Sequence, residues 1–518
     1  MAYKYCDWTT GSDLTGDGTA ALPYKTIEKA TLTLVGGDVV RVAKGPSHTT
    51  LSGTLTFVDG SASVATSVDL TGSLAINDLV GKNTDDMCWW RISNITASTI
   101  TLSTVYSGAS QGAVTAYKMG AHDLGTGVIN TYLDRLNGRN GTSTSNRLKI
   151  SGGWNLSTEL QDGETFFKQT GSNQYGWGLS VDGNYIEIEK LHYARCYNGI
   201  DIADTKNGIY IHDVGGYSCG QSGILFRGRN MDCSLGGTIN ISQTANYAIW
   251  FYYNYYPNSF NSEANITIRS CVSGPSLSGG NQYWKHFVIK RTTTNYSLYL
   301  DDLENIRIGE LSIQNGNGVS SNSGATNIII GKYTATVISS AIGTSRETIL
   351  IYHYVPTSVG SDINYQNGDD LNGRPSVVIQ RYGNSNYSGR MYFRGIGVIY
   401  QDATNARTLR CLRFAPTHAT APFAWSIGNV KCMNTNLDID LSVYIKKGGG
   451  LDGIIQMAAF VLGQKVVDWT TVAATTSYAQ YTITVPSSNL VMTEYVELQV
   501  RVSGTSGYAY IDDFSVSQ

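Results

Sequence analysis

Residues 184–202 and 207–226 carry two copies of one short pattern, and this repeat decides the fold. The first copy reads NYIEIEKL (184–191) and NGIDI (198–202), and the second reads NGIYIHDV (207–214) and SGILF (222–226). Their apolar residues align at an offset of 23 or 24 residues. A period in the low twenties with short strands is typical of a solenoid, in which alternate apolar side chains point inward and stack on the next coil.

Related strands recur from about residue 147 to 352. Each opens with Asn, Gly or Glu and places Ile at alternate positions, as in GGTINI (236–241), ANITIRSC (264–271), ENIRIGELSI (304–313) and ETILIYH (347–353). The fixed Leu and Asn consensus of a leucine-rich repeat is missing, which disfavours that architecture. The pattern resembles right-handed parallel β-helices of the pectin-lyase type.

The segment GDGTAALPYKTIEKATLTLVGGDVVRVAKG (16–45) holds the one strong helix signal of the chain. A short apolar run follows Pro23 and ends at Gly36–Gly37, after which VVRVA takes the two-residue period of a strand. The segment resembles the start of pectin-lyase-like chains, where a turn and a helix precede the first strand. Because the first coil of a solenoid has an open edge, we expect this helix to cap it.

Residues 53–119 interrupt the solenoid pattern. They contain two hairpin signals, VDGSASV (58–64) and ITASTITL (95–102), together with the pair Trp89 and Trp90. These features predict a small closed β-barrel or a sandwich. The segment also resembles a module that recurs in structural proteins of tailed phages, where a similar hairpin precedes a Trp-containing strand.

From about residue 395 the predicted strands become longer and lie further apart. Eight or so such strands, including LDIDLSVYIKKG (437–448) and EYVELQVRVSG (494–504), suggest an antiparallel jelly roll. Thr408–Arg410 and Tyr510–Val516 match the first and last strands of carbohydrate-binding-module-like jelly rolls, which this region resembles. That resemblance implies a possible structural calcium ion, with Asp512 or Asp513 as a ligand.

The sequence therefore predicts an all-β fold, a right-handed parallel β-helix with an N-terminal capping helix, an inserted small β-domain and a C-terminal jelly-roll sandwich. The predicted divisions are 1–52 (N-terminal cap and first coil), 53–119 (inserted small barrel or sandwich), 120–354 (parallel β-helix), 355–394 (linker or crossing segment) and 395–518 (jelly roll).

Composition and charge exclude several classes of function. The 518 residues include 57 Gly and 34 Tyr, and charged residues make up 15%, below the usual ~25%. A net charge of −3 gives no basic footprint for nucleic acid. No membrane span and no standard signal peptide is expected, which fits synthesis in a cytoplasm. The eight cysteines lack a CxxC pair, so we expect buried free thiols rather than a metal cluster or a disulfide framework.

Glycan cleavage is the natural enzymatic hypothesis for such a solenoid. Hydrolysis needs two carboxylates, about 5 Å apart for retention or about 6.5–9.5 Å apart for inversion. Acids at matching positions of adjacent coils, roughly 4.8 Å apart, would suit retention. In the aligned copies no acid faces an acid, since Glu189 faces His212 and Asp201 faces Leu225.

No residue stands out as catalytic. His212 reads as structural, and Asp204 lies near Arg227 and Arg229, as in an ion pair. The pectate-lyase calcium cluster and the common hydrolase motifs are missing. The remaining candidate acids are Glu189, Asp201, Asp204, Asp213, Asp301, Asp302 and Glu304.

The stretch NYAIWFYYNYYPNSF (246–260) is unusually aromatic. On a strand alternate rings face outward, where they can stack on sugar rings, form a subunit interface or lie under a covering loop. All three interpretations remain open. The candidate glycan-binding or interface residues are Tyr247, Trp250, Tyr252, Tyr253, Tyr255 and Tyr256.

Together the resemblances imply a structural protein of a phage virion, a tailspike-like or tail-fibre-like appendage that recognises host-surface glycan. They imply synthesis in the bacterial host's cytoplasm, a homotrimer, and contacts with other phage structural proteins and host polysaccharide. No cofactor beyond calcium is expected. Two alternatives are a polysaccharide-degrading tailspike, acting as glycoside hydrolase or lyase, and a purely architectural head or tail decoration. An enzyme predicts paired acids in a cleft, and an adhesin predicts an exposed aromatic groove without them.

Overall fold

The computed structural model describes residues 1–82, 88–126, 132–170, 176–252, 260–292, 296–321, 328–344, 349–365, 377–381, 388–394, 397–402, 411–416, 418–432, 434–461, 464–492 and 495–517. The chain divides into two units, Met1–Tyr299 and Leu300–Gln518. No helix in the described ranges has the length and hydropathy of a membrane span.

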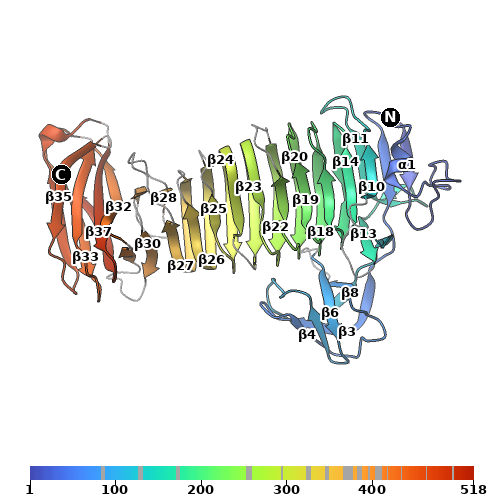
Figure 1. The fold of residues 1–518 in the computed structure, drawn as a ribbon, viewed down its shortest axis with the longest axis horizontal. Helices are drawn as coiled ribbons and strands as arrows, with labels where there is room; N and C mark the ends of the chain where they lie inside the picture. Colours follow the sequence, from blue (N-terminus) through green and yellow to red (C-terminus); the bar gives the residue numbers. More distant parts are fainter. Residues whose placement is uncertain are drawn as a thin grey trace. The chain divides into compact units, whose positions relative to one another are not determined.

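The first unit is a parallel β-helix, as the repeat predicts (Figure 1). One ladder of parallel strands consists of β1 (Tyr3–Cys6), β2 (Val39–Ala43), β11 (Leu148–Asn155), β15 (Ile186–Glu189), β18 (Tyr210–Tyr217), β20 (Cys233–Ser242) and β22 (Phe260–Arg269). A second ladder joins β9 (His122–Thr126), β13 (Thr165–Thr170), β16 (Leu191–Ala194) and the end of β18. The third contains β10 (Tyr132–Asn137), β14 (Trp177–Asp182), β17 (Asn198–Ile202), β19 (Ser222–Arg227), β21 (Ile249–Tyr252) and β23 (Ser276–Lys290).

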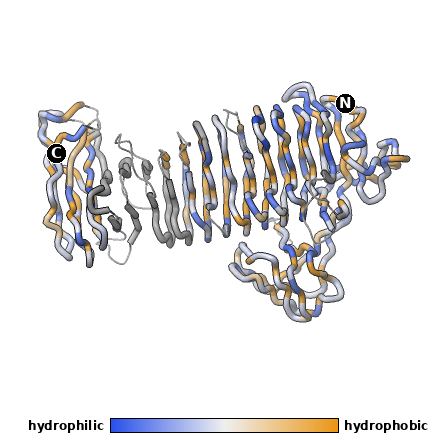
Figure 2. Tube along the Cα trace, in the orientation of Figure 1, coloured by the Kyte–Doolittle hydropathy of each residue, from blue (hydrophilic) through white to orange (hydrophobic). Residues whose placement is uncertain are grey.

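Stacked isoleucines hold successive coils together. Ile150, Ile188 and Ile211 occupy matching positions of three neighbouring strands, and all three are fully buried. The offset of the two sequence copies predicts this register, and Figure 2 shows apolar and polar residues alternating along the coils. Because each coil buries its apolar edge only against its neighbours, the stacking itself forms the core. The seven cysteines whose side chains the structure describes are all buried free thiols.

The coils turn at single residues with left-handed backbone. Lys190 and Asp213 lie where the first ladder passes into the second, each with φ 53°. Gly237 takes the matching place in the next coil, with φ 57°. Four further corners of this kind lie after the second ladder, at Arg195, Ser218, Gln243 and Ser270. These corners fix where each strand ends and therefore where its outward side chains lie.

Helix α1 (Ile27–Thr31) packs against β1, β2 and β10. The Thr26 side chain accepts a hydrogen bond from the Lys29 N–H, 3.1 Å away, and so caps the helix. The buried carboxylate of Asp134 accepts the Ile27 and Glu28 N–H groups at 2.8 and 2.9 Å. Burial raises the pKa of Asp134 to about 6 against the opposing effect of these hydrogen bonds. That α1 caps the first coil remains a prediction.

The insertion forms a closed barrel. Its order is β3 (Thr49–Phe57), β4 (Ser63–Thr66), β7 (Thr99–Leu102), β6 (Trp90–Ile95), β5 (Leu79–Lys82) and β8 (Gln111–Lys118). Phe57, Trp90 and Tyr106 fill its core, with the rings of Trp90 and Tyr106 4.8 Å apart. The Gln243 side chain accepts the Arg91 N–H at 3.0 Å, which ties the barrel to the solenoid.

The second unit begins with parallel strands β24 (Leu298–Gln314), β26 (Ile328–Thr344) and β27 (Ile349–Tyr365). Residues 355–394, the predicted linker or crossing segment, include the end of β27 and the strands β28 (Val377–Arg381) and β29 (Ser388–Arg394).

The rest of this unit is antiparallel and forms a sandwich, as the jelly-roll interpretation predicts. One sheet has the order β36 (Ala479–Val485), β33 (Ile439–Lys447), β38 (Ala509–Ser517) and β31 (Cys411–Pro416). The other has the order β35 (Gln464–Val472), β34 (Ile455–Val461), β37 (Tyr495–Gly504) and β32 (His418–Lys431). Thr408–Arg410, the predicted first-strand match, lie outside the described residues.

Candidate functional site

The outward face of the β35–β34–β37 sheet carries an aromatic ring beside a row of hydrogen-bonding side chains. Met457 and Val500 are buried in the sandwich core, so their strand neighbours Gln456 and Arg501 point to the opposite face. Gln456 lies opposite Arg501 on one side and opposite Thr471 on the other. Three strands thus place three polar groups in one line.

This sandwich face, defined by Gln456, Phe460, Trp469, Thr471, Glu497, Gln499 and Arg501, is internally bonded. Arg501 Nε donates to Gln456 Oε1 at 2.8 Å, and Gln456 Nε2 donates to Thr471 Oγ1 at 3.3 Å. In the next row Gln499 Nε2 donates to Glu497 Oε1 at 2.7 Å. These bonds hold the amide and guanidinium groups in place, and a prearranged site loses less entropy on binding.

Trp469 supplies the flat apolar surface of the sandwich face. Its indole ring is half-buried and meets the Phe460 ring edge-on, with centroids 6.0 Å apart. The Arg501 guanidinium lies 4.2 Å from the indole centroid, within cation–π range. Burial lowers the pKa of Arg501. An aromatic ring with adjacent amides, a guanidinium and a carboxylate suits a sugar, which has an apolar ring face and hydroxyls that both donate and accept.

The residues of the sandwich face were not predicted from the sequence. Their signal is present in the alternation of EYVELQVRVSG (494–504), where Glu497, Gln499 and Arg501 alternate with residues of the core. The same reading applied to GIIQMAAFVLG (453–463) places Gln456 outward. Which strands lie side by side could not be read from the sequence, so the line that these residues form was not predictable.

A second polar cluster, the charged ladder, lies on the first ladder of the solenoid and comprises Lys149, Glu187, Glu189, His212 and Asp213. Lys149 lies opposite Glu187 and Glu189 opposite His212, which agrees with the predicted register for Glu189. Lys149 Nζ is 3.0 Å from Glu187 Oε1 and 2.9 Å from Glu189 Oε2. His212 Nε2 is 3.3 and 3.4 Å from the same two oxygens.

The charges of the ladder shift one another's pKa values. The hydrogen bond with His212 lowers the pKa of Glu187 to about 2. Burial opposes this shift, and the hydrogen bond and charge of Lys149 add to it. Burial would raise the pKa of Glu189, but hydrogen bonds from Ser151, Lys149 and Gln161 lower it. Burial would lower the pKa of His212, but its carboxylate partners raise it. Both glutamates are therefore ionised at neutral pH.

This arrangement limits the chemistry of the ladder. Ligand atoms of Glu187, Glu189 and His212 lie within 4.8 Å of one another, the right size for a metal ion. Lys149, however, already places its ammonium between the two carboxylates, which disfavours a second cation there. The carboxylate spacing is also near that of a retaining hydrolase, but neither glutamate keeps the proton that a general acid needs.

Asp201 and Asp204 have structural partners. Asp201 is buried and receives two hydrogen bonds from Arg227, at 2.8 and 2.7 Å. Burial raises the pKa of Asp201 against the effect of this ion pair. The sequence predicts Asp204 near Arg227 and Arg229, as in an ion pair, but in the structure the Arg227 guanidinium pairs with Asp201. Asp204 instead accepts the backbone N–H of Arg229 at 2.7 Å, because the turn after β19 brings that N–H to it.

Among the other predicted acids, Asp213 belongs to the charged ladder. Asp213, at a left-handed corner, lies 3.0 Å from His212 Nδ1 and accepts the Thr238 N–H at 2.9 Å. Asp301 lies on β24 of the second unit, and the side chains of Asp302 and Glu304 lie outside the described part.

Part of the aromatic stretch is described. Trp250 and Tyr252 lie on β21, and Tyr247 precedes that strand. The Trp250 ring contacts both tyrosines, with centroids 5.3 Å from Tyr247 and 4.6 Å from Tyr252. All three are partly exposed, so they form a surface cluster, the β21 aromatic cluster. Tyr253, Tyr255 and Tyr256 lie outside the described residues.

Asp512 and Asp513 lie on β38. Asp512 is buried, and its Oδ1 accepts the Asp513 N–H at 2.9 Å. Among the described residues, no group of three possible His, Cys, Asp or Glu ligands includes either of them. Calcium at this position therefore stays a prediction that needs oxygen ligands of other kinds.

Comparison with known proteins leaves the family open. No family model matches the chain, and no curated protein matches it. Among solved structures, the chain is similar to the CBM22-1 xylan-binding domain of Paenibacillus barcinonensis Xyn10C, at 14% identity over 25% of this chain and 85% of that one, with a TM-score of 0.20. It is similar to the enzymatically active domain of bacteriophage CBA120 tailspike protein 4, at 10% identity over 79% and 70%, also with a TM-score of 0.20. At such TM-scores these likenesses carry no argument about function.

Proposed function

We propose that this protein binds carbohydrate and that the sandwich face is its binding surface. The observation that carries the proposal is the line of Thr471, Gln456 and Arg501 beside the half-buried Trp469 ring. The ring offers a surface on which a sugar ring can stack. For comparison, stacking between two aromatic rings contributes about 0.5–1.5 kcal/mol beyond the burial of their area. The amides, guanidinium and carboxylate offer both donors and acceptors to sugar hydroxyls.

We further propose that the protein is an appendage of a phage virion that attaches to host-surface glycan. The closed barrel at residues 53–119 supports this setting, because that segment resembles a module of phage structural proteins. One sandwich face gives a modest affinity, and several copies on one particle would multiply it. A homotrimer and contacts with other virion proteins belong to the same proposal.

The test is a binding measurement with matched variants. Purified protein is incubated with a panel of bacterial surface polysaccharides, and both retention and new reducing ends are scored. We expect retention without cleavage. Trp469→Ala should weaken retention at least tenfold, because the stacking surface is lost, whereas Gln480→Ala, on an exposed position of the opposite sheet, should not. Equal retention by wild type and W469A would contradict the proposal.

A second candidate function is cleavage of the bound glycan at the charged ladder. The close carboxylates of Glu187 and Glu189 favour it, and His212, whose pKa these partners raise against the effect of burial, would be the proton donor in its protonated form. New reducing ends that disappear in a His212→Gln variant would establish this function. Their absence with every polysaccharide that the protein retains would exclude it.

A further inference from the structure

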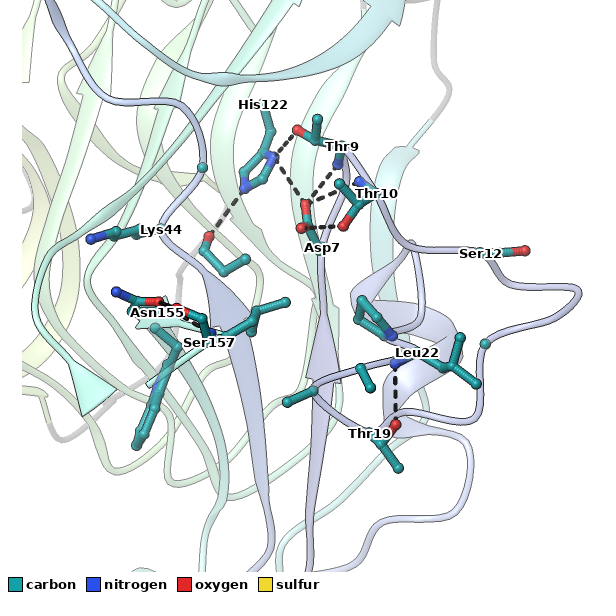
Figure 3. A pocket seen from close by; sticks show the side chains of 18 of the residues that line it. Asp7, Thr9, Thr10, Ser12, Thr19, Leu22, Lys44, His122, Asn155 and Ser157 are labelled. Carbon is teal, nitrogen blue, oxygen red and sulfur yellow. Dashed lines mark hydrogen bonds and ion pairs between the residues drawn. The ribbon is translucent and has the colours of Figure 1, made fainter. Parts of the chain in front are cut away.

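A large polar pocket in the first unit is lined by residues that belong neither to the charged ladder nor to the β21 aromatic cluster (Figure 3). Its volume is about 1030 Å³, at the upper end of the range for small-molecule sites. Its lining comes from the loop from Asp7 to Pro23, residues 43–46 at the end of β2, residues 154–159 at the end of β11, and His122 at the start of β9. A pocket of this size has room for several rings rather than one.

Buried His122 joins two walls of this pocket. Its Nε2 lies 3.1 Å from the Ala43 carbonyl oxygen, and its Nδ1 lies 2.8 Å from Thr9 Oγ1. A carbonyl oxygen only accepts, so Nε2 carries the proton and Nδ1 accepts from the Thr9 hydroxyl. Burial lowers the pKa of His122, which keeps the ring neutral. The Thr9 hydroxyl thus has a fixed orientation (Figure 3).

The surrounding loops are fixed by their own hydrogen bonds. Asp7 accepts the Thr9 N–H at 2.8 Å and the Thr10 hydroxyl at 2.6 Å. Thr19 Oγ1 accepts the Leu22 N–H at 3.1 Å, and Asn155 Oδ1 accepts the Ser157 hydroxyl at 2.8 Å. A pocket with walls fixed in this way does not have to be ordered by its ligand.

The lining disfavours a ligand with negative charge. Each charged side chain of the lining has a partner within the protein. Asp7 is hydrogen-bonded as described, and Lys44 Nζ lies 3.1 Å from Asp162 Oδ1. Glu159 accepts the Tyr5 hydroxyl at 2.6 Å. Arg41 Nη1 also lies 3.8 Å from Glu159 Oε2. Asp7 is therefore the one charged side chain of the lining whose partners are all neutral, and its negative charge disfavours an anionic ligand.

The remaining lining combines hydroxyls with apolar surface. Thr9, Thr15 and Thr19 contribute hydroxyls, and Leu22 is 55% exposed at the rim. Trp154 also lines the pocket, and the Arg41 guanidinium holds its indole from 4.1 Å. Hydroxyls beside exposed apolar and aromatic surface suit ligands with apolar ring faces and many hydroxyl groups.

We infer that this pocket is a second carbohydrate-binding site, specific for a neutral oligosaccharide of several units. It shares with the proposed function only the class of ligand, because no residue of the sandwich face contributes to it. The two sites can therefore be tested separately on the full chain.

The experiment is isothermal titration of the full chain with neutral hexasaccharides of glucose, galactose and mannose and with an acidic hexasaccharide of galacturonic acid. Wild type is compared with W469A, with Thr15→Trp, which fills the mouth of the pocket, and with the W469A/T15W double variant. Thr15 has an exposed side chain, so the added indole does not disturb the core. Thr115→Trp, an exposed position on β8, is the matched control, and thermal melts establish that each variant is folded.

We expect W469A to keep binding at least one neutral hexasaccharide and T15W to weaken that binding at least tenfold, while T115W leaves it unchanged. If W469A loses all hexasaccharide binding and T15W loses none, the pocket is not a carbohydrate-binding site. That result would still be consistent with binding at the sandwich face. Stronger binding of the acidic than of the neutral hexasaccharides at the pocket would also overturn the pocket proposal. If wild type binds no neutral hexasaccharide, the pocket proposal is wrong. Binding at the sandwich face is tested separately, by polysaccharide retention in wild type and W469A.

Discussion

His212 has carboxylates on two strands around it, and this makes the charged ladder sensitive to pH. Its protonated form pairs with Glu187, Glu189 and Asp213, and Lys149 balances the glutamates from the neighbouring coil. Because the folded-state pKa of His212 is raised above 6.5, its stabilisation is complete below about pH 6.5 and is lost as the pH rises through the raised value. The pKa of Glu187 is lowered from 4.5 to about 2, so its stabilisation is lost as the pH falls below 4.5.

We therefore expect His212→Gln to remove part of the pH dependence of stability. Between pH 6.5 and 9 the melting temperature of wild type should fall relative to that of H212Q, because only wild type loses an imidazolium held by carboxylates. Scanning calorimetry at half-unit pH steps measures the difference. His286→Gln, at a partly exposed histidine of the same unit, serves as control. If the melting temperatures of wild type and H212Q change with pH in parallel, the ion pairs of His212 with the three carboxylates would be contradicted.

For single residues, the sequence predicts some partners in these polar clusters and not others. The offset of 23 residues places Glu189 opposite His212, and the structure agrees. Lys149 could not be placed beside Glu187, because the strand that carries it precedes the aligned copies. Arg227 was predicted near Asp204, but its guanidinium bonds to Asp201. Similar positions in the sequence do not show which side chains point outward from the same face of adjacent strands.

At the scale of the element, the left-handed corners decide where strands end. The sequence does not reveal them, because Lys190, Arg195 and Asp213 are not the glycines that positive φ normally favours. The corners recur in register from coil to coil, so stacking holds them in place despite a local cost of order 1 kcal/mol each. Regular strand periodicity, by contrast, is visible directly in the isoleucine pattern.

Lys190 offers a test of this corner. Lys190→Val places a β-branched residue at φ 53°, where its side chain crowds the backbone, whereas Lys190→Asn keeps a residue that tolerates this conformation. We expect K190V to lower the free energy of unfolding of the first unit by roughly 1–2 kcal/mol relative to K190N. Urea denaturation followed by tryptophan fluorescence gives the comparison. Equal midpoints for the two variants would show that the corner is not a fixed left-handed turn.

At the scale of the whole molecule, the sequence predicts the architecture better than the sites. The repeat predicts a solenoid, the hairpin signals predict a small barrel or sandwich, and the longer strands predict a jelly-roll sandwich. The structure contains a solenoid, a closed barrel at the position of the hairpin signals, and a sandwich. The sandwich face was missed because it depends on the order β35–β34–β37, which pairs strands that are not all neighbours in the sequence. Long-range strand order is set by packing rather than by local pattern.

The β21 aromatic cluster bears on assembly. Partly exposed Tyr247, Trp250 and Tyr252 are the residue types enriched at protein interfaces. If the protein is a homotrimer, light scattering should give three times the chain mass of 56.1 kDa, and Trp250→Ser should lower that mass. Thr115→Ser on the barrel is the control. A mass equal to one chain for wild type at micromolar concentration would contradict the trimer.

Whether carbohydrate binds at the sandwich face can be seen in a crystal structure of the complex. A crystal of the full chain is soaked with an oligosaccharide cut from a polysaccharide that the protein retains. We expect a sugar ring stacked on Trp469, with hydroxyls within hydrogen-bond distance of Gln456, Glu497 or Arg501, which are partly exposed. An oligosaccharide bound elsewhere, with the β35–β34–β37 face left bare, would contradict it.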